Sequence, residues 1–417
     1  MKDVIILFAL YVLVTGIIAS NESYPLFNFF PSLKNIPKIK IIIGYTPLQK
    51  LSLYKEAFQF KNEIYIKRDD LTEPPYLEPT RLGGNKARKL EFLFSDAQRL
   101  GRHSLICPGE WGTNTGFSIA ALADHLKFGQ VELIVGPQPI TKDVKEKLLA
   151  EHALGAKLSY YGNDYSLILG ITWSMATTRF SSSRYFINGG ASSDLSDLPY
   201  LGWLLLKNPI DTTKLGDLGF INAFLELQEQ FNSIGQELPS EIYVPAGSLG
   251  TSAGLLVGNC LAGTLDKVTI VAVQVGPGMA CNSSLMVSKA KRLMKFFEEY
   301  LSEEDKKKLP KCDFTKGFKW VSDYYEPGYG SPHSGQTEVT ESIKKIENLT
   351  VDVTYTGKSF LAMHNRLLAQ KDTKSVLFWQ TYIAYDLNII IDAFNWTDKN
   401  APWKDLPSSF HHIFENK

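Results

Sequence analysis

Apolar residues recur with helical spacing in the stretch that follows Asn85. Four of them stand at positions i, i+3, i+4 and i+7: Leu90, Leu93, Phe94 and Ala97. Gly101 comes shortly after them and is a typical C-terminal stop signal, and Asn85 is a residue that caps helix N-termini. The pattern predicts an amphipathic helix that begins just after Asn85 and buries one face.

Lys86 lies on the buried side of this predicted helix. At about 100° per residue it falls close to the apolar stripe, whereas Arg88 points to the opposite side. We therefore expect Lys86 to face the interior and Arg88 to face water. Burial disfavours the charged form of a lysine, so Lys86 suits a nucleophilic amine that attacks a carbonyl. The alternative is a side chain that runs along the helix end to solvent.

Short apolar strands alternate with longer helices in the segment after Gly101. The expected strands cover residues 104–107, 131–135 and 157–161, and the expected helices cover 115–126 and 141–154. This alternation predicts a parallel sheet covered on both faces by helices. A polar loop over 189–199 then marks a domain boundary. The second half resumes with a helix over 218–231 and strands over 268–275 and 376–382.

A glycine-rich turn joins a strand to a helix at residues 247–251, Gly-Ser-Leu-Gly-Thr. Small residues at a helix N-terminus leave backbone N–H groups free to bind an anion, so the turn is a candidate phosphate site. A purely structural strand-to-helix turn is the other interpretation. The turn lacks the lysine of a nucleoside-triphosphate loop and the full glycine spacing of a dinucleotide site, which argues against both classes.

Composition narrows the function classes further. The 417 residues contain 44 Lys+Arg and 44 Asp+Glu, without the basic excess of a nucleic-acid-binding protein. The four cysteines are Cys107, Cys260, Cys281 and Cys312. They are too widely spaced for a zinc site or a disulfide framework, and we expect no metal site. One pair could bridge in an oxidising compartment, and the sequence does not say which.

The amino terminus has the features of a secretory signal. Lys2 precedes an uncharged apolar run over residues 4–18 that ends in Ala19-Ser20. We interpret residues 1–20 as a signal peptide, which predicts a secreted, periplasmic or secretory-lumen protein. The alternative is an uncleaved membrane anchor, although about 18 apolar residues are expected for a span. Only in that case would the protein contact a membrane.

Taken together and in order, these segments resemble the pyridoxal-phosphate enzymes of the tryptophan-synthase-β-like fold, in particular the branch of D-cysteine desulfhydrase and aminocyclopropane-carboxylate deaminase. The most specific parts are residues 67–71, Lys-Arg-Asp-Asp-Leu, and 83–91, which resemble the family's signature around its Schiff-base lysine. The resemblance implies an α/β fold with two three-layer α/β/α domains and parallel-rich sheets. Residues 21–88 and 200–417 would form the large cofactor-binding domain, and residues 89–199 the small domain.

The resemblance also implies a site. Lys86 would hold the aldehyde of pyridoxal 5'-phosphate, and five residues of the glycine-rich turn would bind its phosphate: Gly247, Ser248, Leu249, Gly250 and Thr251. Asn114 would lie beside the ring hydroxyl and Thr381 at the pyridine nitrogen. Thr113 would line the substrate carboxylate, and Tyr329 and Tyr355 would lie near the leaving group.

Two positions favour the desulfhydrase side of this branch. Thr356 and Thr381 match desulfhydrases, where the deaminases resemble one another in having glutamate and leucine. The implied reaction is α,β-elimination from a small D-amino acid, with pyruvate, ammonia and hydrogen sulfide as products of D-cysteine, carried out by a homodimer. A deaminase or a racemase on the same scaffold, and an exported ligand-binding pseudo-enzyme, are the alternatives.

The chain also departs from the family pattern. The family's Ser-Asn-His is Thr113-Asn114-Thr115 here, and its His-Thr-Gly-Gly is Gln380-Thr381-Tyr382-Ile383. We expect the extra methyl group of Thr113 to shift the substrate carboxylate and the large side chain of Tyr382 to narrow the pocket.

Overall fold

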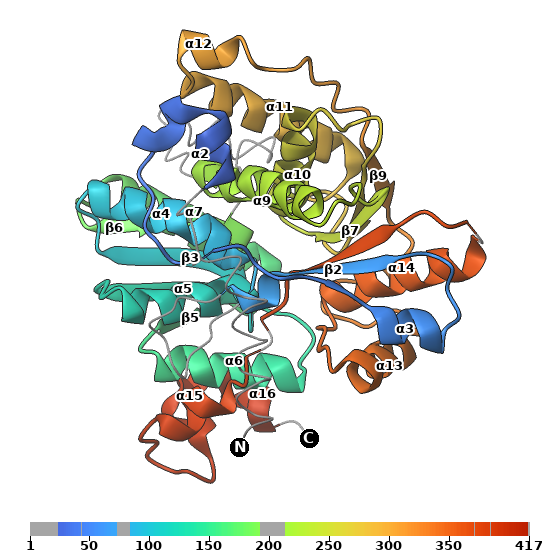
Figure 1. Ribbon diagram of the computed structural model, residues 1–417. Helices are drawn as coiled ribbons and strands as arrows, with labels where there is room; N and C mark the ends of the chain where they lie inside the picture. The colour runs from blue at the N-terminus through green and yellow to red at the C-terminus, as the bar shows by residue number, and fades with distance from the viewer. Residues whose placement is uncertain are drawn as a thin grey trace, which may run out of the picture.

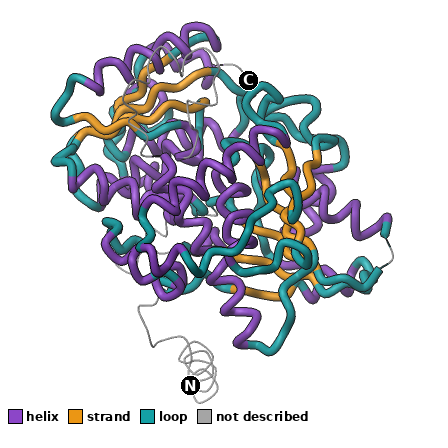
Figure 2. The backbone as a smooth tube through the Cα atoms, turned by 90° about the horizontal axis from the view of Figure 1, so that it is seen from above, coloured by secondary structure: helices purple, strands orange, loops and turns teal. Residues whose placement is uncertain are grey.

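The strands form two separate sheets, and almost all of their pairings are parallel. The computed structural model describes residues 24–415 except 43, 73–83, 192–212, 371 and 384, so the predicted signal segment and Gly83 lie outside the described residues. The six-stranded sheet has the order β1-β2-β10-β7-β8-β9, and only its edge strand β1 runs antiparallel. The four-stranded sheet has the order β5-β4-β3-β6 and is entirely parallel. Figure 2 shows the two sheets as separate groups of orange strands.

The strands of the larger sheet are β1 (Leu48–Lys50), β2 (Ile64–Arg68), β7 (Glu241–Ala246), β8 (Thr269–Gln274), β9 (Phe318–Val321) and β10 (Val376–Gln380). Those of the smaller sheet are β3 (Ser104–Glu110), β4 (Gln130–Gly136), β5 (Lys157–Tyr160) and β6 (Arg184–Phe186).

The helices are α2 (Pro25–Phe29), α3 (Ser52–Ala57), α4 (Lys86–Arg99), α5 (Asn114–His125), α6 (Lys142–Ala153), α7 (Asp164–Arg179), α9 (Thr213–Ser233), α10 (Gly250–Leu261), α11 (Ser283–Glu299), α12 (Glu303–Lys306), α13 (Gln336–Glu347), α14 (Thr356–Ala369), α15 (Asn388–Ala393) and α16 (His411–Glu415). Short 3-10 turns are η1 (Pro31–Asn35), η2 (Asp69–Leu71), η3 (Gly189–Ala191), η5 (Pro402–Asp405) and η6 (Ser408–Phe410).

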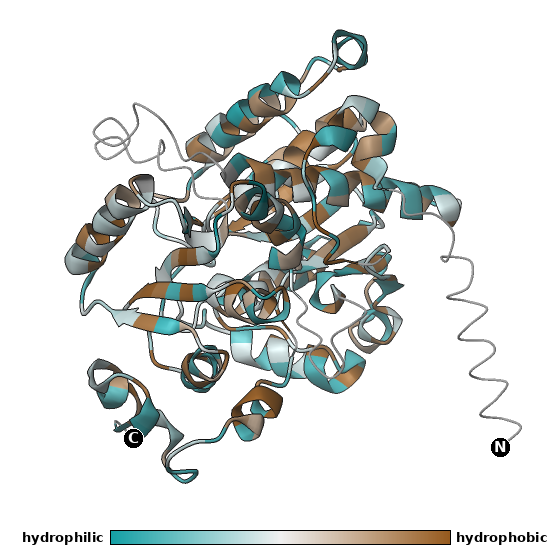
Figure 3. Ribbon diagram, turned by 90° about the vertical axis from the view of Figure 1, so that its left-hand side faces the viewer, coloured by the Kyte–Doolittle hydropathy of each residue, from teal (hydrophilic) through white to brown (hydrophobic). Residues whose placement is uncertain are grey.

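Both sheets are covered on both faces, because alternate strand residues pack into different helix layers. In β2, Ile64 and Ile66 pack in a core with residues of α13 and α14, whereas Tyr65 joins the core of α9 and α10. In the smaller sheet, Leu105 packs toward α5 and α6, and Ile106 toward α7. Figure 1 shows these layers, and Figure 3 shows hydrophobic brown residues along the central strands. The predicted fold class of two three-layer α/β/α units is confirmed.

The predicted helix after Asn85 is confirmed as α4, and it ends where expected. Its last residue is Arg99, and Gly101 follows with φ +65° and a backbone N–H that donates to the carbonyl oxygen of Gln98 at 2.9 Å. The expected strands and helices of residues 104–161 correspond to β3, α5, β4, α6 and β5. Strand β3 continues past the prediction to Glu110 and so reaches the site described below.

The prediction that Arg88 faces water is wrong. Its side chain is 3% exposed and forms ion pairs with Asp69 and Glu226, in which Nη2 lies 2.8 Å from Asp69 Oδ1 and Nη1 lies 2.8 Å from Glu226 Oε2. Lys67, the last inward residue of β2, also pairs with Glu226 and donates to Gln230 Oε1 at 2.6 Å. Helix α4 is buried on this side as well, because Glu226 of α9 and Asp69, just after β2, supply charged partners for Arg88.

The C-terminal segment packs on the unit that contains the smaller sheet. Helix α15 contacts α6, and His152 of α6 stacks on Trp396 with ring centroids 5.8 Å apart. Further on, Phe410 packs edge-on against Tyr160 of β5. The domain boundaries remain a prediction, but this segment, assigned above to the large domain, covers the small one. Among the described residues, no helix is long and apolar enough to cross a membrane.

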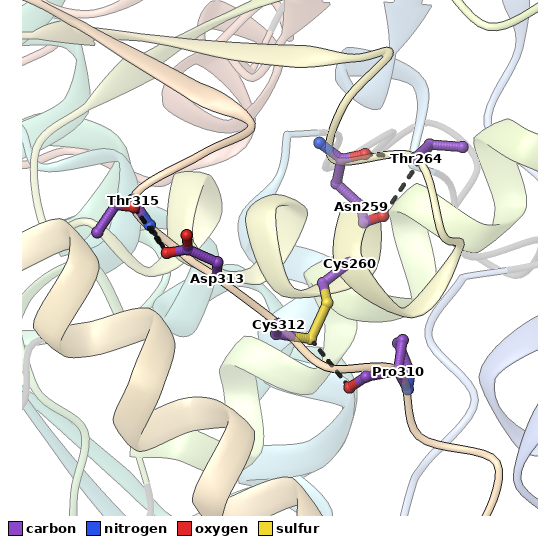
Figure 4. The surroundings of a disulfide bond; sticks show 7 residues. All are labelled: Asn259, Cys260, Thr264, Pro310, Cys312, Asp313 and Thr315. Atoms are coloured by element: carbon purple, nitrogen blue, oxygen red, sulfur yellow. Dashed lines mark hydrogen bonds between the residues drawn. A yellow bond between two sulfur atoms is a disulfide. The ribbon is translucent and has the colours of Figure 1, made fainter.

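Cys260 and Cys312 form a disulfide bond between α10 and the segment before β9 (Figure 4). Cys107 and Cys281 are free and buried. The bond joins residues 52 positions apart, so it closes a long loop in the unfolded chain. The sequence did not indicate which cysteines pair, and the structure shows that the bonded pair links α10 to the segment between α12 and β9.

We expect the double variant Cys260→Ser/Cys312→Ser to unfold with a free energy about 2–4 kcal/mol lower than that of the wild type. The reason is that the unfolded chain regains the loop freedom that the bond removes. Chemical denaturation in the presence and absence of a reductant measures the difference. The reductant should destabilise the wild type and leave the double variant unchanged; equal sensitivity of both proteins would contradict the prediction.

Candidate active site

A cavity of about 420 Å³ lies between the two sheets, at the carboxyl ends of their strands. Ten of the eleven predicted site residues line it: Lys86, Thr113, Asn114, Gly247, Ser248, Leu249, Thr251, Tyr329, Tyr355 and Thr381. Gly250 is buried as the first residue of α10 and is not part of the wall. The carboxyl ends of parallel strands are where ligands of open α/β sheets gather, so this is the candidate active site.

Lys86 is the first residue of α4 and reaches into the cavity. Burial, followed by the positive charge of Lys89, lowers its pKa to about 7. Its Nζ atom lies 3.3 Å from Asn85 Oδ1. The amine is therefore largely neutral slightly above neutral pH, which is the form that attacks a carbonyl or accepts a proton.

Asn85 does not cap α4 with its side chain, contrary to the expectation. Its backbone is already helical, and its Nδ2 atom donates instead to Thr251 Oγ1 at 3.1 Å. Its backbone N–H donates to the carbonyl oxygen of Thr381 at 3.2 Å. Asn85 thus ties the start of α4 to α10 and to the end of β10, and it lines the cavity as a site residue that the sequence analysis assigned only to capping.

The glycine-rich turn forms the N-terminus of α10 in the wall of the cavity. Leu249 adopts the left-handed conformation, with φ +64° and ψ −15°, at the residue before the helix. The first N–H groups of a helix have no partner within it, and the helix dipole favours a negative charge there. The turn therefore offers backbone donors to an anion such as a phosphate.

Asn114 and Thr113 stand at the N-terminus of α5. The Oδ1 atom of Asn114 is buried and has no hydrogen-bond partner among the described residues, which suits a wall that a ligand completes. Thr113 caps α5 by accepting from the N–H of Thr115 at 3.3 Å. A Cβ atom built on Gly109 or Gly116 would lie 2.8 or 2.7 Å from the Thr113 methyl carbon, so these glycines make room for the methyl group that we expected to disturb the site.

Tyr355 and Tyr329 form a hydroxyl pair that is held in place from α14. Asp352 accepts from the backbone N–H of Tyr355 at 2.8 Å, which fixes the residue before the helix. Lys358, buried on α14, donates to the carbonyl oxygens of Tyr325 and Gly328 at 2.7 and 2.8 Å and so anchors the loop that carries Tyr329. The two hydroxyl groups are hydrogen-bonded to each other.

Several wall residues were missed by the sequence analysis. The carboxyl group of Glu110, at the end of β3, is hydrogen-bonded to the Tyr329 hydroxyl at 3.3 Å, and no local motif distinguishes it from any other strand-end carboxyl group. The loop Asn188–Gly190 also lines the cavity. A Cβ atom on Gly190 would lie 2.4 Å from Ser248 Oγ, so the glycine at this position, interpreted as part of a boundary loop, allows close contact with the glycine-rich turn.

The expectation that Tyr382 narrows the pocket is wrong, and Thr356, which favoured the desulfhydrase side, also lies outside the cavity wall. Tyr382 does not line the cavity; its hydroxyl donates to Asp143 Oδ1 on α6 at 2.9 Å. Thr356 is fully buried and its hydroxyl is bonded to the carboxylate of Asp352, so it supports the backbone at Tyr355 without reaching the cavity.

Comparison with known proteins gives consistent matches. The model of the family described as "Pyridoxal-phosphate dependent enzyme" matches residues 39–379. Among solved structures, an ACC deaminase homologue superimposes with a TM-score of 0.63 at 24% identity, covering 85% of this chain and 94% of the other. A hydrogen sulfide-producing enzyme from Fusobacterium nucleatum and a threonine deaminase from T.th. each give a TM-score of 0.51. They are 12% and 14% identical, and each match covers 87% of this chain and 98% of the other. These structural similarities show the fold.

Proposed function

This chain belongs to the family of pyridoxal-phosphate-dependent enzymes, and on that premise we propose that it catalyses α,β-elimination from a small D-amino acid, as a D-cysteine desulfhydrase does. The observation that carries the proposal is that one cavity contains both the Lys86 amine and the hydroxyl pair of Tyr329 and Tyr355. An amine and a hydroxyl donor suit a reaction that removes a proton at one carbon and releases a group from the next.

The residues of the cavity fit the cofactor. The N-terminus of α10 with its glycine-rich turn would hold the phosphate, and the unpartnered Asn114 Oδ1 and the hydroxyl of Thr381 would meet the ring. Lys86 would hold the aldehyde carbon. When bound, pyridoxal phosphate supplies an electron-withdrawing system that stabilises negative charge at the substrate's α-carbon.

Side chains of the protein would accept the α-proton, bind the substrate carboxylate and contact the leaving group. Lys86, whose pKa is lowered to about 7, can hold a proton taken from the α-carbon. Thr113 and the N-terminus of α5 would bind the substrate carboxylate, because a helix N-terminus favours an anion. Tyr355 and Tyr329 would stand near the β-substituent that leaves.

The test is the addition of D-cysteine to the purified protein supplied with pyridoxal phosphate, with pyruvate, ammonia and sulfide measured together. We expect all three in equal amounts, and much less from L-cysteine. Inversion of the α-carbon without release would favour a racemase instead. Retention of the cofactor without turnover of any D- or L-amino acid in a panel would favour a ligand-binding pseudo-enzyme.

We also propose that the protein works in an oxidising compartment. The signal-like segment of residues 1–20 and the Cys260–Cys312 bond both support this, since disulfide bonds persist mainly in secreted and luminal proteins.

A further inference from the structure

Glu110 lies at one end of a hydrogen-bonded chain of three side chains in the cavity wall. The Tyr329 hydroxyl lies 3.3 Å from Glu110 Oε2, and the Tyr329 and Tyr355 hydroxyls are bonded to each other. All three residues line the same cavity as Lys86. Neither tyrosine meets a basic side chain in the hydrogen bonds of the described residues, so the carboxyl is the titratable group at the end of the chain that can set its direction.

The charge state of Glu110 decides the direction in which the hydrogen bonds of Glu110, Tyr329 and Tyr355 are donated, because each phenol carries a single proton. If Glu110 holds a proton, it donates to Tyr329, Tyr329 donates to Tyr355, and the Tyr355 proton is directed to the cavity. If Glu110 is ionised, both tyrosines donate toward it, and Tyr355 offers the cavity only lone pairs. Protonated Glu110 thus makes Tyr355 a donor at the site.

The surroundings of Glu110 favour its protonated form. Burial raises its pKa, and the carboxylate of Asp164 on α7 acts in the same direction, whereas its backbone and Tyr329 hydrogen bonds act in the opposite one. At the other end of the hydrogen-bonded chain, the carboxyl groups of Asp352 and of Asp143 on α6 act on Tyr355. Burial is therefore the main influence that favours a proton on the carboxyl of Glu110.

We propose that Glu110 is a positioning residue that directs the Tyr355 proton at the substrate's β-substituent, so that this site eliminates a β-hydroxyl group as water. The inference rests on the proposed function. In the step, the Cβ–O bond breaks and its electron pair stays on oxygen, which takes the proton of Tyr355. Tyr355 takes the proton of Tyr329, and Tyr329 takes that of Glu110. The α-proton passes to Lys86 Nζ, and exchange with solvent restores the proton of Glu110.

The test compares two leaving groups on one carbon skeleton. Hydroxide needs a proton to depart as a leaving group, whereas chloride does not. A variant that has lost proton donation should therefore be slowed on D-serine much more than on β-chloro-D-alanine. We expect Glu110→Gln to lower the ratio of their kcat/KM values, serine over chloroalanine, by about 10²-fold, which is within the usual contribution of a general acid. Tyr329→Phe, which interrupts the chain but keeps the carboxyl, should lower the ratio in the same direction.

A pH profile and a matched control accompany this comparison. For the wild type, kcat/KM for D-serine should fall as the pH rises through the pKa of Glu110, because the acid form is required, and this fall should be absent in Glu110→Gln. Glu303→Gln makes the same carboxyl-to-amide change on α12, outside the cavity and with the side chain 85% exposed, so it should change the ratio by less than about threefold.

Three outcomes would overturn the inference. Equal losses on both substrates in Glu110→Gln would indicate a structural role for Glu110. A wild type that eliminates chloride and sulfide but never water would contradict the role of Glu110 and leave the proposed function standing. A wild type that holds the cofactor but acts on none of D-cysteine, D-serine and chloroalanine would overturn both.

Discussion

Lys86→Ala is expected to lower turnover of any amino-acid substrate by at least about 10³-fold, since one residue provides both the covalent attachment point and the proton acceptor. The visible absorption that a covalently attached cofactor gives the protein should also disappear. Because the pKa of Lys86 is lowered to about 7, mainly by burial, the rate of cofactor attachment to the wild type should rise with pH through about 7 and level off above it.

Absorbance spectra and initial rates measure both effects. Lys142→Ala is a suitable control, since that lysine is on the solvent side of α6 with its side chain 87% exposed. The control should keep colour and rate. A Lys86→Ala protein that is as coloured and as active as the wild type would remove Lys86 from the mechanism.

Arg88→Ala is expected to lower the free energy of unfolding by about 3–5 kcal/mol, because it leaves the buried carboxylate of Asp69 without its cation and Glu226 with only Lys67. Lys404→Ala is the control, since Lys404 pairs with Asp398 at the surface and the two side chains are 55% and 39% exposed. Exposed pairs contribute about 0–1 kcal/mol, so chemical denaturation should separate the two variants. Equal losses would mean that the buried cluster has no special role in stability.

The same cluster should make the free energy of unfolding depend on pH in the acidic range. Burial by itself would raise the pKa of Glu226, but the positive charges of Arg88 and Lys67 outweigh it and lower that pKa to about 2. An unfolded glutamate titrates at about 4.3. The contribution is therefore complete above about pH 4.3 and is lost as the pH falls toward 2. Denaturation midpoints measured across this window should fall for the wild type and less steeply for Glu226→Gln; parallel curves would contradict the assignment.

The fold and most residues of the cavity could be predicted from the sequence, whereas the contacts of individual side chains could not. The β-α rhythm of residues 104–161 predicts one parallel sheet, and the helix phase places Lys86 inward, because both depend only on local periodicity. Arg88 shows the limit of that reasoning. A helical wheel recognises a buried face by its apolar residues, so it misses a second buried face whose charges are paired by Asp69 and Glu226 from distant parts of the chain.

Glu110 and Asn85 were missed for a related reason. A carboxylate at a strand end and an asparagine at a helix start both have an ordinary local explanation, solvent and capping respectively. Their hydrogen bonds to Tyr329 and Thr251 span 219 and 166 positions in the sequence, so they form only when the elements that line the cavity come together. A resemblance to a family carries over residues that occupy its motifs. Glu110 lies outside the quoted motifs, and Asn85 lies inside one, where it was given only a capping role.

The contact between Tyr382 and Asp143 has a mechanical consequence. Tyr382 directly follows Thr381, whose side chain lines the cavity, and its hydroxyl donates across the interface to α6. Lys147 completes this junction by donating to the other carboxylate oxygen of Asp143 at 2.6 Å. Any movement of α6 away from β10 must stretch or break the Tyr382–Asp143 bond. A shift of α6 would therefore be transmitted to the backbone beside Thr381 in the cavity wall.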